Sequence, residues 1–308
     1  MDYEKVYYVD EEDTDKRIDK FLADYETEHS RTYIQKLIAD GNVTVDGKNV
    51  KSNYKLTEGE CIRFLLPEPI PLNVHPENIP LDVVYEDEDI IIINKPKDMV
   101  VHPAPGHMSG TLVNALLYHC KDNLSGINGV LRPGIVHRID KDTTGIIIAC
   151  KNDVAHKNIA EQLKCHTGKR VYHALVHGIF KNKEGRIAAP IGRSQIDRKK
   201  MAINEKNGKP AITNYKVLEE YQGKYSYIEC RLETGRTHQI RVHMASIHHP
   251  LVGDSVYSNY NDSGFRTNGQ VLHAALLGIM HPTTGQYVEF TAENPEYFKL
   301  LLKKLRSC

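Results

Sequence analysis

Residues 136–145 read VHRIDKDTTG and hold the first candidate for chemistry, Asp140. The stretch places a His-Arg pair just before two acidic residues, Asp140 and Asp142, and turn-forming residues follow them. Asp, Thr and Gly are also typical of a turn between two strands, because Asp and Thr bond to nearby backbone groups and Gly tolerates positive φ. The stretch alone leaves two interpretations open, a simple turn and an aspartate held for chemistry.

A second polar stretch, RLETGRTHQIRVHMA at 231–245, carries Arg236, His238, Gln239, Arg241 and His243. Alternation over 238–243 would place Gln239, Arg241 and His243 on one face of a strand and the apolar residues between them on the other. A solvated edge strand is the alternative interpretation, since runs of charge usually face water. Both interpretations predict a strand here.

The sequence lacks the motifs of several other chemistries. It contains no G-x-G-x-x-G, no G-x-x-x-x-G-K-[ST] and no G-x-S-x-G. No motif therefore supports dinucleotide binding, nucleoside triphosphate binding or a serine hydrolase function. There are sixteen histidines, and their clusters, at 238–243 and 248–249, match neither H-E-x-x-H nor a Cys/His zinc site. We therefore expect no cofactor and no metal.

Composition sets the broad class of the protein. The 308 residues, 40% of them apolar, suffice for two domains with a sizeable core. Forty basic and forty acidic residues cancel, so a polyanionic partner must be held by local patches. The six cysteines contain no C-x-x-C pair, which indicates reduced thiols. The aliphatic runs are too short to span a membrane and the N-terminus lacks a signal core, so we expect a cytoplasmic protein.

The elements that must position these residues begin with a small N-terminal module. Apolar residues between Thr14 and Lys36 recur at helical spacing and predict two short helices. Ser30 can cap the second helix, and Gly41 can end it. GNVTVDGKNV then alternates around an Asp-Gly dipeptide, which predicts a hairpin, and GECIRFLL adds a strand.

Five prolines fall within residues 66–80, which is the composition of a linker. We therefore expect a domain at 1–70, a Pro-rich linker at 71–80 and a second domain at 81–308. In the second domain, strand-like runs are interleaved with helical stretches such as 111–120 and 153–166. The order is too irregular for a parallel doubly wound sheet, so the second domain is predicted to be mixed α and β.

Together these segments resemble the RluA-type family of RNA pseudouridine synthases, and specifically its large-subunit ribosomal RNA branch. GIVHRIDKDTTGIIIA is similar to the family's catalytic motif, in which His-Arg-[Leu/Ile]-Asp carries the essential aspartate. KRVYHALVHG resembles the tyrosine motif, and LETGRTHQIRVHMASIHHPLVGD the arginine motif. The N-terminal module resembles an S4 RNA-binding domain. The similarity covers nearly the whole chain in the right order.

The resemblance implies a role for each matched residue. Asp140 would be the catalytic aspartate, Tyr172 the residue against the target base and Arg241 the ion-pair partner of the aspartate. The expected catalytic and substrate-binding residues are Asp140, Tyr172, Arg241, Arg138, His137, Ile240, Gln239 and Arg236. The sequence departs from the motifs in having Thr144 where Ser is usual and Val171 where a basic residue often precedes the tyrosine.

The resemblance also implies a fold and partners. The expected fold is α+β, with a mixed, mainly antiparallel β-sheet catalytic domain with flanking helices and a small S4-like α/β RNA-binding domain. The expected partner is large-subunit ribosomal RNA, alone or in an assembling subunit, with a monomer as the default state. In the S4-like module, Arg17 and Lys20 are spaced i, i+3 on one helix, and Arg31 and Lys36 bracket the next, so the four could face phosphate together.

The chemistry of uridine isomerisation fits these residues. The reaction breaks the C1′–N1 bond, turns the uracil and joins C5 to the same carbon, without a redox step or a group donor. One ionised carboxylate can suffice, either as the nucleophile at C1′ or as a base on the sugar. A carboxylate in a dry pocket needs a partner cation to remain charged, and Arg241 is our hypothesis for that cation.

Two other functions are weighed against this one. A non-catalytic ribosome-assembly factor would use the same RNA surface, but the intact set of Asp140, Tyr172 and Arg241 argues against it. A nucleoside hydrolase would release free uracil and would not need an RNA-binding module.

Overall fold

The computed structural model describes residues 3–27, 29–66, 74–104, 106–121, 123–129, 131–197, 200–262, 264–265 and 267–307. The chain divides into two compact units, Met1–Leu72 and Asn73–Cys308. None of the helices in these ranges is long and apolar enough to cross a membrane.

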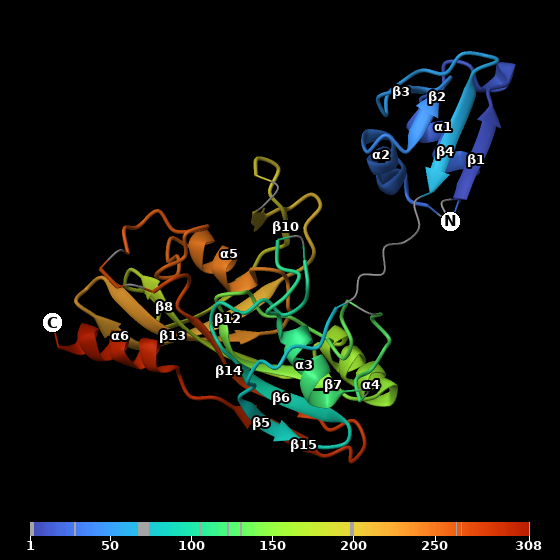
Figure 1. The fold of residues 1–308 in the computed structure, drawn as a ribbon. Coiled ribbons are helices and arrows are strands. Elements are labelled where there is room, and N and C mark those ends of the chain that lie inside the picture. The colour runs from blue at the N-terminus through green and yellow to red at the C-terminus, as the bar shows by residue number, and fades with distance from the viewer. Residues whose placement is uncertain are drawn as a thin grey trace. The chain divides into compact units, whose positions relative to one another are not determined.

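The first unit packs two helices on one small sheet (Figure 1). The sheet is antiparallel throughout, in the order β1-β4-β2-β3. Its core is formed by apolar residues of both helices and of β2 and β4. The elements are β1 (Tyr3–Tyr8), the short 3-10 helix η1 (Glu11–Asp13), α1 (Ile18–Tyr25), α2 (Arg31–Ala39), β2 (Val43–Val45), β3 (Lys48–Asn49) and β4 (Cys61–Leu66).

Local sequence signals explain where these elements start and end. The Ser30 side chain accepts a hydrogen bond from the Tyr33 N–H at 3.3 Å and caps α2. Gly41, just past the end of α2, has φ +80°. Asp46 and Gly47 have φ +47° and +73°, as the tight turn between β2 and β3 requires. The predicted cap, helix end and hairpin are all confirmed.

The expected linker at 71–80 begins outside the described residues, which resume at Val74. Residues 74–80 have no regular secondary structure, but they pack on the second unit. Val74 is buried in that unit's core, and the Asn114 side chain donates to the His75 carbonyl oxygen at 2.8 Å. From Val74 onward the chain is therefore part of the second unit.

The second unit is built on one nine-stranded sheet. Its order is β5-β6-β7-β14-β8-β13-β12-β9, with β15 paired to β14. Only β7 and β14 run parallel among the described pairs of this sheet, which confirms the mixed, mainly antiparallel prediction. The strands are β5 (Val83–Glu86), β6 (Ile90–Lys95), β7 (Thr144–Cys150), β8 (Lys169–His177), β9 (Glu184–Ala188), β12 (Ile212–Tyr221), β13 (Tyr225–Leu232), β14 (Leu272–Met280) and β15 (Tyr287–Thr291), and β10 (Ile191–Arg193) pairs with β11 (Met201–Ile203) in a separate hairpin.

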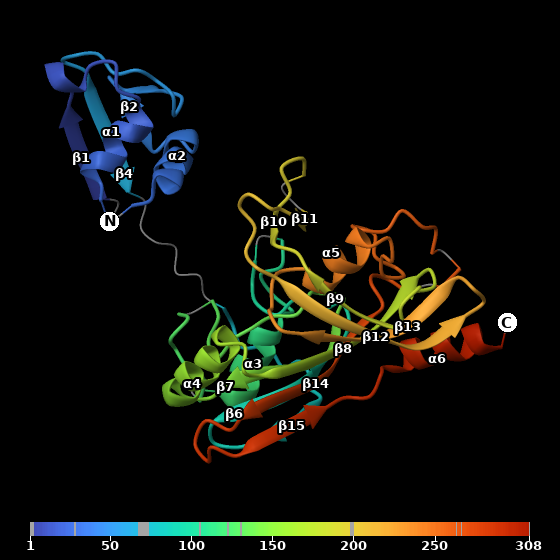
Figure 2. The ribbon, with the colours of Figure 1, turned by 180° about the vertical axis from the view of Figure 1, so that it is seen from behind.

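Helices flank this sheet on both faces (Figures 1 and 2). They are α3 (Leu112–Cys120), α4 (Asp153–Lys164), α5 (Gln239–Ser246) and α6 (Glu296–Arg306). The α3 helix packs on alternate residues of β6 and β7, and α4 packs on the residues between them, so these two helices cover opposite faces. In the same way α5 and α6 cover opposite faces of β8. Tyr172 packs against the clusters of both α3 and α5, which places it where the two halves of one face meet.

The predicted strand at 238–243 is wrong, because these residues lead into and form α5. The alternation of polar and apolar residues suggested a strand, but the helix is buried on nearly all sides, so its polar residues do not mark a solvent face. Ile240 and Met244, spaced i, i+4, are the residues that pack against the sheet. His238 precedes the helix with φ +56°, a conformation that the sequence does not signal.

Gly145, in the parallel pairing of β7 with β14, tests this architecture. It has φ +107°, and a Cβ atom there would lie 2.2 Å from the Ala274 carbonyl oxygen. Gly145→Ala is therefore expected to lower the free energy of unfolding by about 3 kcal/mol or more. Gly285→Ala is the control, because Gly285 has φ +66° but open space around it; we expect a loss of about 1–2 kcal/mol there. Urea unfolding measures both, and equal losses would contradict the close approach of the two strands.

Candidate active site

Asp140 lies in the irregular segment that leads into β7. The Thr143 N–H donates to the Asp140 carbonyl oxygen at 3.0 Å and turns the chain into the strand. Upstream, the His137 Nε2 accepts the Ile148 N–H of β7 at 3.1 Å. Every residue of β7 is buried, so these bonds fix the segment that carries Asp140 to the centre of the sheet.

Lys95, at the end of β6, also holds the segment that carries Asp140. Its side chain is fully buried, and Nζ donates to the carbonyl oxygens of Pro96, Met99 and Lys141 at 2.7, 2.9 and 2.9 Å. Burial lowers the pKa of Lys95 to about 7, against the opposing charges of Asp142 and Asp140. The three carbonyls match the three N–H donors of an ammonium group, so Lys95 ties the peptide next to Asp140 to the strand beside it.

Arg241, on α5, bridges two carboxylates. Its Nη1 donates to Asp140 Oδ2 at 2.9 Å, and its Nε and Nη2 donate to the two oxygens of Asp254 at 2.7 and 2.9 Å. The Asp254 side chain is 0% exposed, and its Oδ1 also accepts the N–H groups of Val256 and Tyr257. Burial alone would lower the pKa of Arg241, but the bonds and charges of Asp254 and Asp140 raise it above its ordinary value. Arg241 is therefore a permanent cation whose orientation Asp254 fixes.

His238 faces the other oxygen of Asp140. Its Nε2 lies 3.7 Å from Asp140 Oδ1, and its Nδ1 lies 2.8 Å from the Tyr257 hydroxyl. That hydroxyl accepts the Met201 N–H at 2.9 Å, which leaves its own proton free to be donated to Nδ1. Burial lowers the pKa of His238, although Asp140 opposes the shift. We assign a neutral ring with the proton on Nε2, directed toward Asp140.

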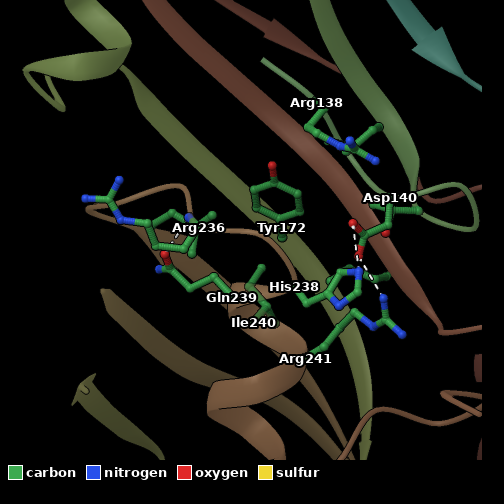
Figure 3. Close-up of a pocket in the computed structure, with 12 residues that line it drawn as sticks. Arg138, Asp140, Tyr172, Arg236, His238, Gln239, Ile240 and Arg241 are labelled. Carbon is green, nitrogen blue, oxygen red and sulfur yellow. Dashed lines mark hydrogen bonds and ion pairs between the residues drawn. The ribbon is translucent and has the colours of Figure 1, made fainter. Parts of the chain in front are cut away.

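These side chains surround a pocket with an empty volume of about 360 Å³. Figure 3 shows Tyr172, from β8, and Ile240, from α5, around the same space as Asp140 and Arg241. Burial raises the pKa of Tyr172, so its hydroxyl is protonated at neutral pH. The pocket therefore offers one carboxylate, a ring face and an apolar wall in one place.

The other expected site residues lie around this pocket in different roles. Arg138 is exposed at the pocket wall, and Arg236 lines it with Nε bound to the Pro210 carbonyl oxygen at 3.0 Å. Gln239 also lines the pocket, but its amide is engaged by Thr234, Thr213 and two backbone groups. His137 lines only a neighbouring groove, and burial together with Arg170 lowers its pKa to about 4.

In the first unit, the four expected RNA-binding residues divide into two kinds. Arg17 and Arg31 both donate to the buried carboxylate of Asp19, Arg17 at 3.0 Å and Arg31 at 3.0 Å, and so tie the starts of α1 and α2 together. Lys20 and Lys36 are exposed and, among the residues described, have no ion-pair partner. The arginines are thus partly structural, and the lysines are the free charges.

One group could offer three ligand atoms to a metal ion: Asp87, Asp89 and His281, with atoms within 4.8 Å of one another. His281 Nε2 already lies 2.7 Å from Asp87 Oδ2. Burial alone would raise the pKa of Asp87, but hydrogen bonds from the Ile90 N–H and the Tyr85 hydroxyl lower it to about 2. In the described part of the chain, these bonds join the turn between β5 and β6 to the turn between β14 and β15. They explain the cluster without a metal ion.

Sequence reasoning missed Asp254, Tyr257 and the position of His238. Asp254 is the last residue of the arginine motif, but its spacing of 13 from Arg241 indicates no contact by itself. Tyr257 lies in an irregular loop. Both reach the site only because the chain turns back after α5, which no local pattern signals.

Comparison with known proteins agrees with this fold. Residues 89–246 match the family model described as RNA pseudouridylate synthase, and residues 16–62 match the S4 domain. The human RNA pseudouridylate synthase domain containing 1 superposes with a TM-score of 0.56 at 24% identity, over 79% of this chain and 98% of that one, and so shares the fold.

Two bacterial proteins have a much higher sequence identity to this chain than the human protein has. The chain is 52% identical over 296 residues to the uncharacterized RNA pseudouridine synthase YlyB of Bacillus subtilis, covering 96% of each protein. It is 45% identical over 298 residues to the ribosomal large subunit pseudouridine synthase D of Zymomonas mobilis, covering 94% of this chain and 93% of that protein. The chain belongs to the RNA pseudouridine synthase family and carries an S4 domain. The expected family, fold class and enzymatic nature are confirmed.

The bridge through Arg241 predicts separable effects on stability and rate. Arg241→Met leaves the buried Asp254 unpaired and is expected to lower the free energy of unfolding by about 3–5 kcal/mol. The double variant Arg241→Met/Asp254→Asn removes that stranded charge and should recover most of the stability but none of the activity, because Asp140 still lacks its cation. Thermal unfolding and the rate of pseudouridine formation measure the two effects. Recovery of activity in the double variant would contradict a role for Arg241 at Asp140.

Proposed function

We propose that this enzyme converts specific uridines of large-subunit ribosomal RNA to pseudouridine, with Asp140 as the catalytic carboxylate. One observation carries the proposal: Asp140 has one oxygen bound by the buried Arg241 and opens into a pocket walled by Tyr172 and Ile240. An ion-paired carboxylate beside a ring is what a reaction at the sugar of an extruded uridine requires.

The reaction is an isomerisation in which no atom is gained or lost. The C1′–N1 bond breaks, uracil leaves with the electron pair, and the base turns so that C5 bonds to C1′. The proton on C5 is lost and N1 gains one. Asp140 can attack C1′ or take a proton from the sugar, and both routes need it ionised, which the Arg241 ion pair supports.

Tyr172 is proposed to hold the base during this turn. A uridine stacked in RNA must be extruded to reach the pocket, and an extruded base is stabilised by an aromatic face. Tyr172 and Ile240 supply a ring and an apolar wall on the same pocket. We assign Arg138, which is exposed at the rim, to the gap that the extruded nucleotide leaves.

Ribosomal RNA of the large subunit is the proposed substrate because several similar proteins carry that substrate in their names. Besides the Zymomonas protein, the ribosomal large subunit pseudouridine synthase D of Pseudomonas aeruginosa is 41% identical over 302 residues. The S4 domain supports an RNA substrate over a free nucleoside. We infer that the enzyme works in the cytoplasm, as a monomer, on free RNA or on an assembling subunit.

The alternative function, a non-catalytic assembly factor, would not need a buried cation on Asp140. The triad of Arg241, Asp140 and Asp254 removes three charges from water, and RNA binding alone gives no reason to keep it. The complete set of Asp140, Tyr172 and Arg241 therefore favours catalysis.

The S4 domain is proposed to bind RNA through its exposed lysines. Lys20→Glu/Lys36→Glu should weaken binding to ribosomal RNA and flatten its salt dependence, by up to about 1.8 in slope if both contact phosphate. These lysines are better targets than Arg31, because reversing Arg31 would oppose the buried Asp19. Lys224→Glu/Lys303→Glu, in the second unit, changes the net charge equally and is the control. Filter binding between 50 and 200 mM KCl measures the slopes; equal slopes for both double variants would count against RNA contact by the S4 domain.

Pseudouridine mapping tests the proposed function directly. Purified protein and its Asp140→Asn variant are incubated with large-subunit ribosomal RNA that lacks pseudouridine, and the product is mapped by reverse-transcription stops after carbodiimide treatment. Stops are expected with the unmutated protein, and the variant should be slower by roughly 10³-fold or more. The positions of the stops identify the modified uridines.

The outcomes of this mapping are distinct. Stops of equal strength from both proteins would show that Asp140 is not the catalytic carboxylate. If neither protein produces stops on free RNA or on assembling subunits, while both bind RNA tightly, the assembly-factor function is favoured instead.

A further inference from the structure

A second hollow adjoins the catalytic pocket and is called here the basic groove. It has an empty volume of about 1320 Å³, part of it open to solvent. The catalytic pocket and the basic groove share walls, so a strand of RNA can run from one into the other. The shared residues are Arg138, Asp140, Tyr172, Leu232, Arg236 and His238.

Arg170 lies in the wall of this groove and, in the described part of the chain, has no counter-ion. It is on β8 two residues before Tyr172, so the two side chains lie on the same face of the strand. Arg170 is only 8% exposed. Its Nε is buried and, among the described residues, has no hydrogen-bond partner. Within the ranges that the structure describes, its guanidinium has one hydrogen bond, a long one of 3.4 Å from Nη2 to the Glu233 carbonyl oxygen. Among the described residues no carboxylate forms an ion pair with it.

The residues around Arg170 add positive charge, and no free acidic residue among the described walls neutralises it. Arg138, Arg236 and Lys164 also line the basic groove, and Asp140 is the one acidic residue among its described walls. Asp140 is already paired with Arg241, and Lys164 pairs with Glu161 outside the groove. The groove therefore gathers three arginines in the same wall as Asp140.

Gly235 makes room for the guanidinium. A Cβ atom on Gly235 would lie 2.6 Å from Arg170 Nη1, so a side chain there would displace the arginine. The backbone at Gly235 leaves space for a buried cation that makes one long hydrogen bond and no ion pair with the described residues. Such a group is unfavourable by itself, because a buried charge without a partner loses its hydration.

We propose that Arg170 binds a phosphate of the RNA backbone next to the uridine held in the catalytic pocket. The inference rests on the proposed function, since it assumes an RNA substrate at Asp140. A guanidinium with unused donors matches two oxygens of a phosphate, and a phosphate there would supply the missing counter-charge. Because Arg170 and Tyr172 are neighbours on β8, binding of that phosphate sets where the nucleotide lies along the strand relative to the ring.

The first test measures RNA binding of Arg170→Met and Arg170→Lys in the Asp140→Asn background, where turnover is too slow to change the RNA during the measurement. Unmodified large-subunit ribosomal RNA is the probe, and KCl is varied from 50 to 200 mM. Arg170→Met should weaken binding roughly 5- to 10-fold at 100 mM KCl and lower the slope of log K against log [KCl] by about 0.7–0.9. Arg170→Lys should keep the slope. Arg306→Met, an exposed arginine on α6, is the matched control and should change neither.

Thermal unfolding of the same variants separates binding from a structural role. Because Arg170 is a buried cation without an ion-pair partner in the described chain, Arg170→Met should leave the Tm unchanged or raise it. A lower Tm with an unchanged salt slope would overturn the proposal and make Arg170 a structural residue.

The second test locates the phosphate. Once a modified uridine has been mapped, short RNAs around it are made with one neutral methylphosphonate linkage at a time. The protein with Arg170 should lose affinity at one linkage adjoining the target uridine, and Arg170→Met should lose nothing further at that linkage. Equal sensitivity of both proteins at every linkage would overturn the proposal, while pseudouridine formation by the unmutated protein would still establish the proposed function.

Discussion

The site depends on the position of one guanidinium between two carboxylates. Arg241 joins α5, the segment before β7 and the loop after α5 through its bonds to Asp140 and Asp254. The pair with Asp254 is fully buried and uses two donors, so it fixes the plane of the guanidinium, and only the remaining donor meets Asp140. A carboxylate at the edge of a pocket is thus held by a cation whose own position is set within the core, with His238 and Lys95 fixing the groups around it.

Features that depend on neighbouring residues could be predicted from the sequence. The cap at Ser30, the helix end at Gly41 and the Asp-Gly hairpin each need only a few adjacent residues, and the structure has all three. The helices at 111–120 and 153–166 were also visible as apolar periodicity. The family and its expected fold followed from motifs, and the comparisons confirm them. Roles for Asp140, Tyr172 and Arg241 came from the same motifs, and the structure places the three side chains on one pocket.

Features that depend on distant residues could not be predicted. The segment after His238 alternates polar and apolar residues, but it forms a buried helix because Thr213, Thr234 and Asp254 satisfy its polar side chains. No local pattern reveals such partners. The parallel pairing of β7 with β14 and the isolation of Arg170 are likewise properties of chain segments far apart in sequence. Composition showed zero net charge and gave no sign that three arginines gather in one groove with Asp140.

The central place of β14 has a consequence for how the protein is made. This strand lies between β7 and β8, yet it comes about 90 residues or more after both along the chain. A growing chain therefore cannot close the middle of the large sheet until Met280 has been synthesised, whereas the S4 sheet needs nothing beyond Leu66. During translation the S4 unit can fold first, and the last third of the chain must emerge before Asp140, Arg241 and Tyr172 come together.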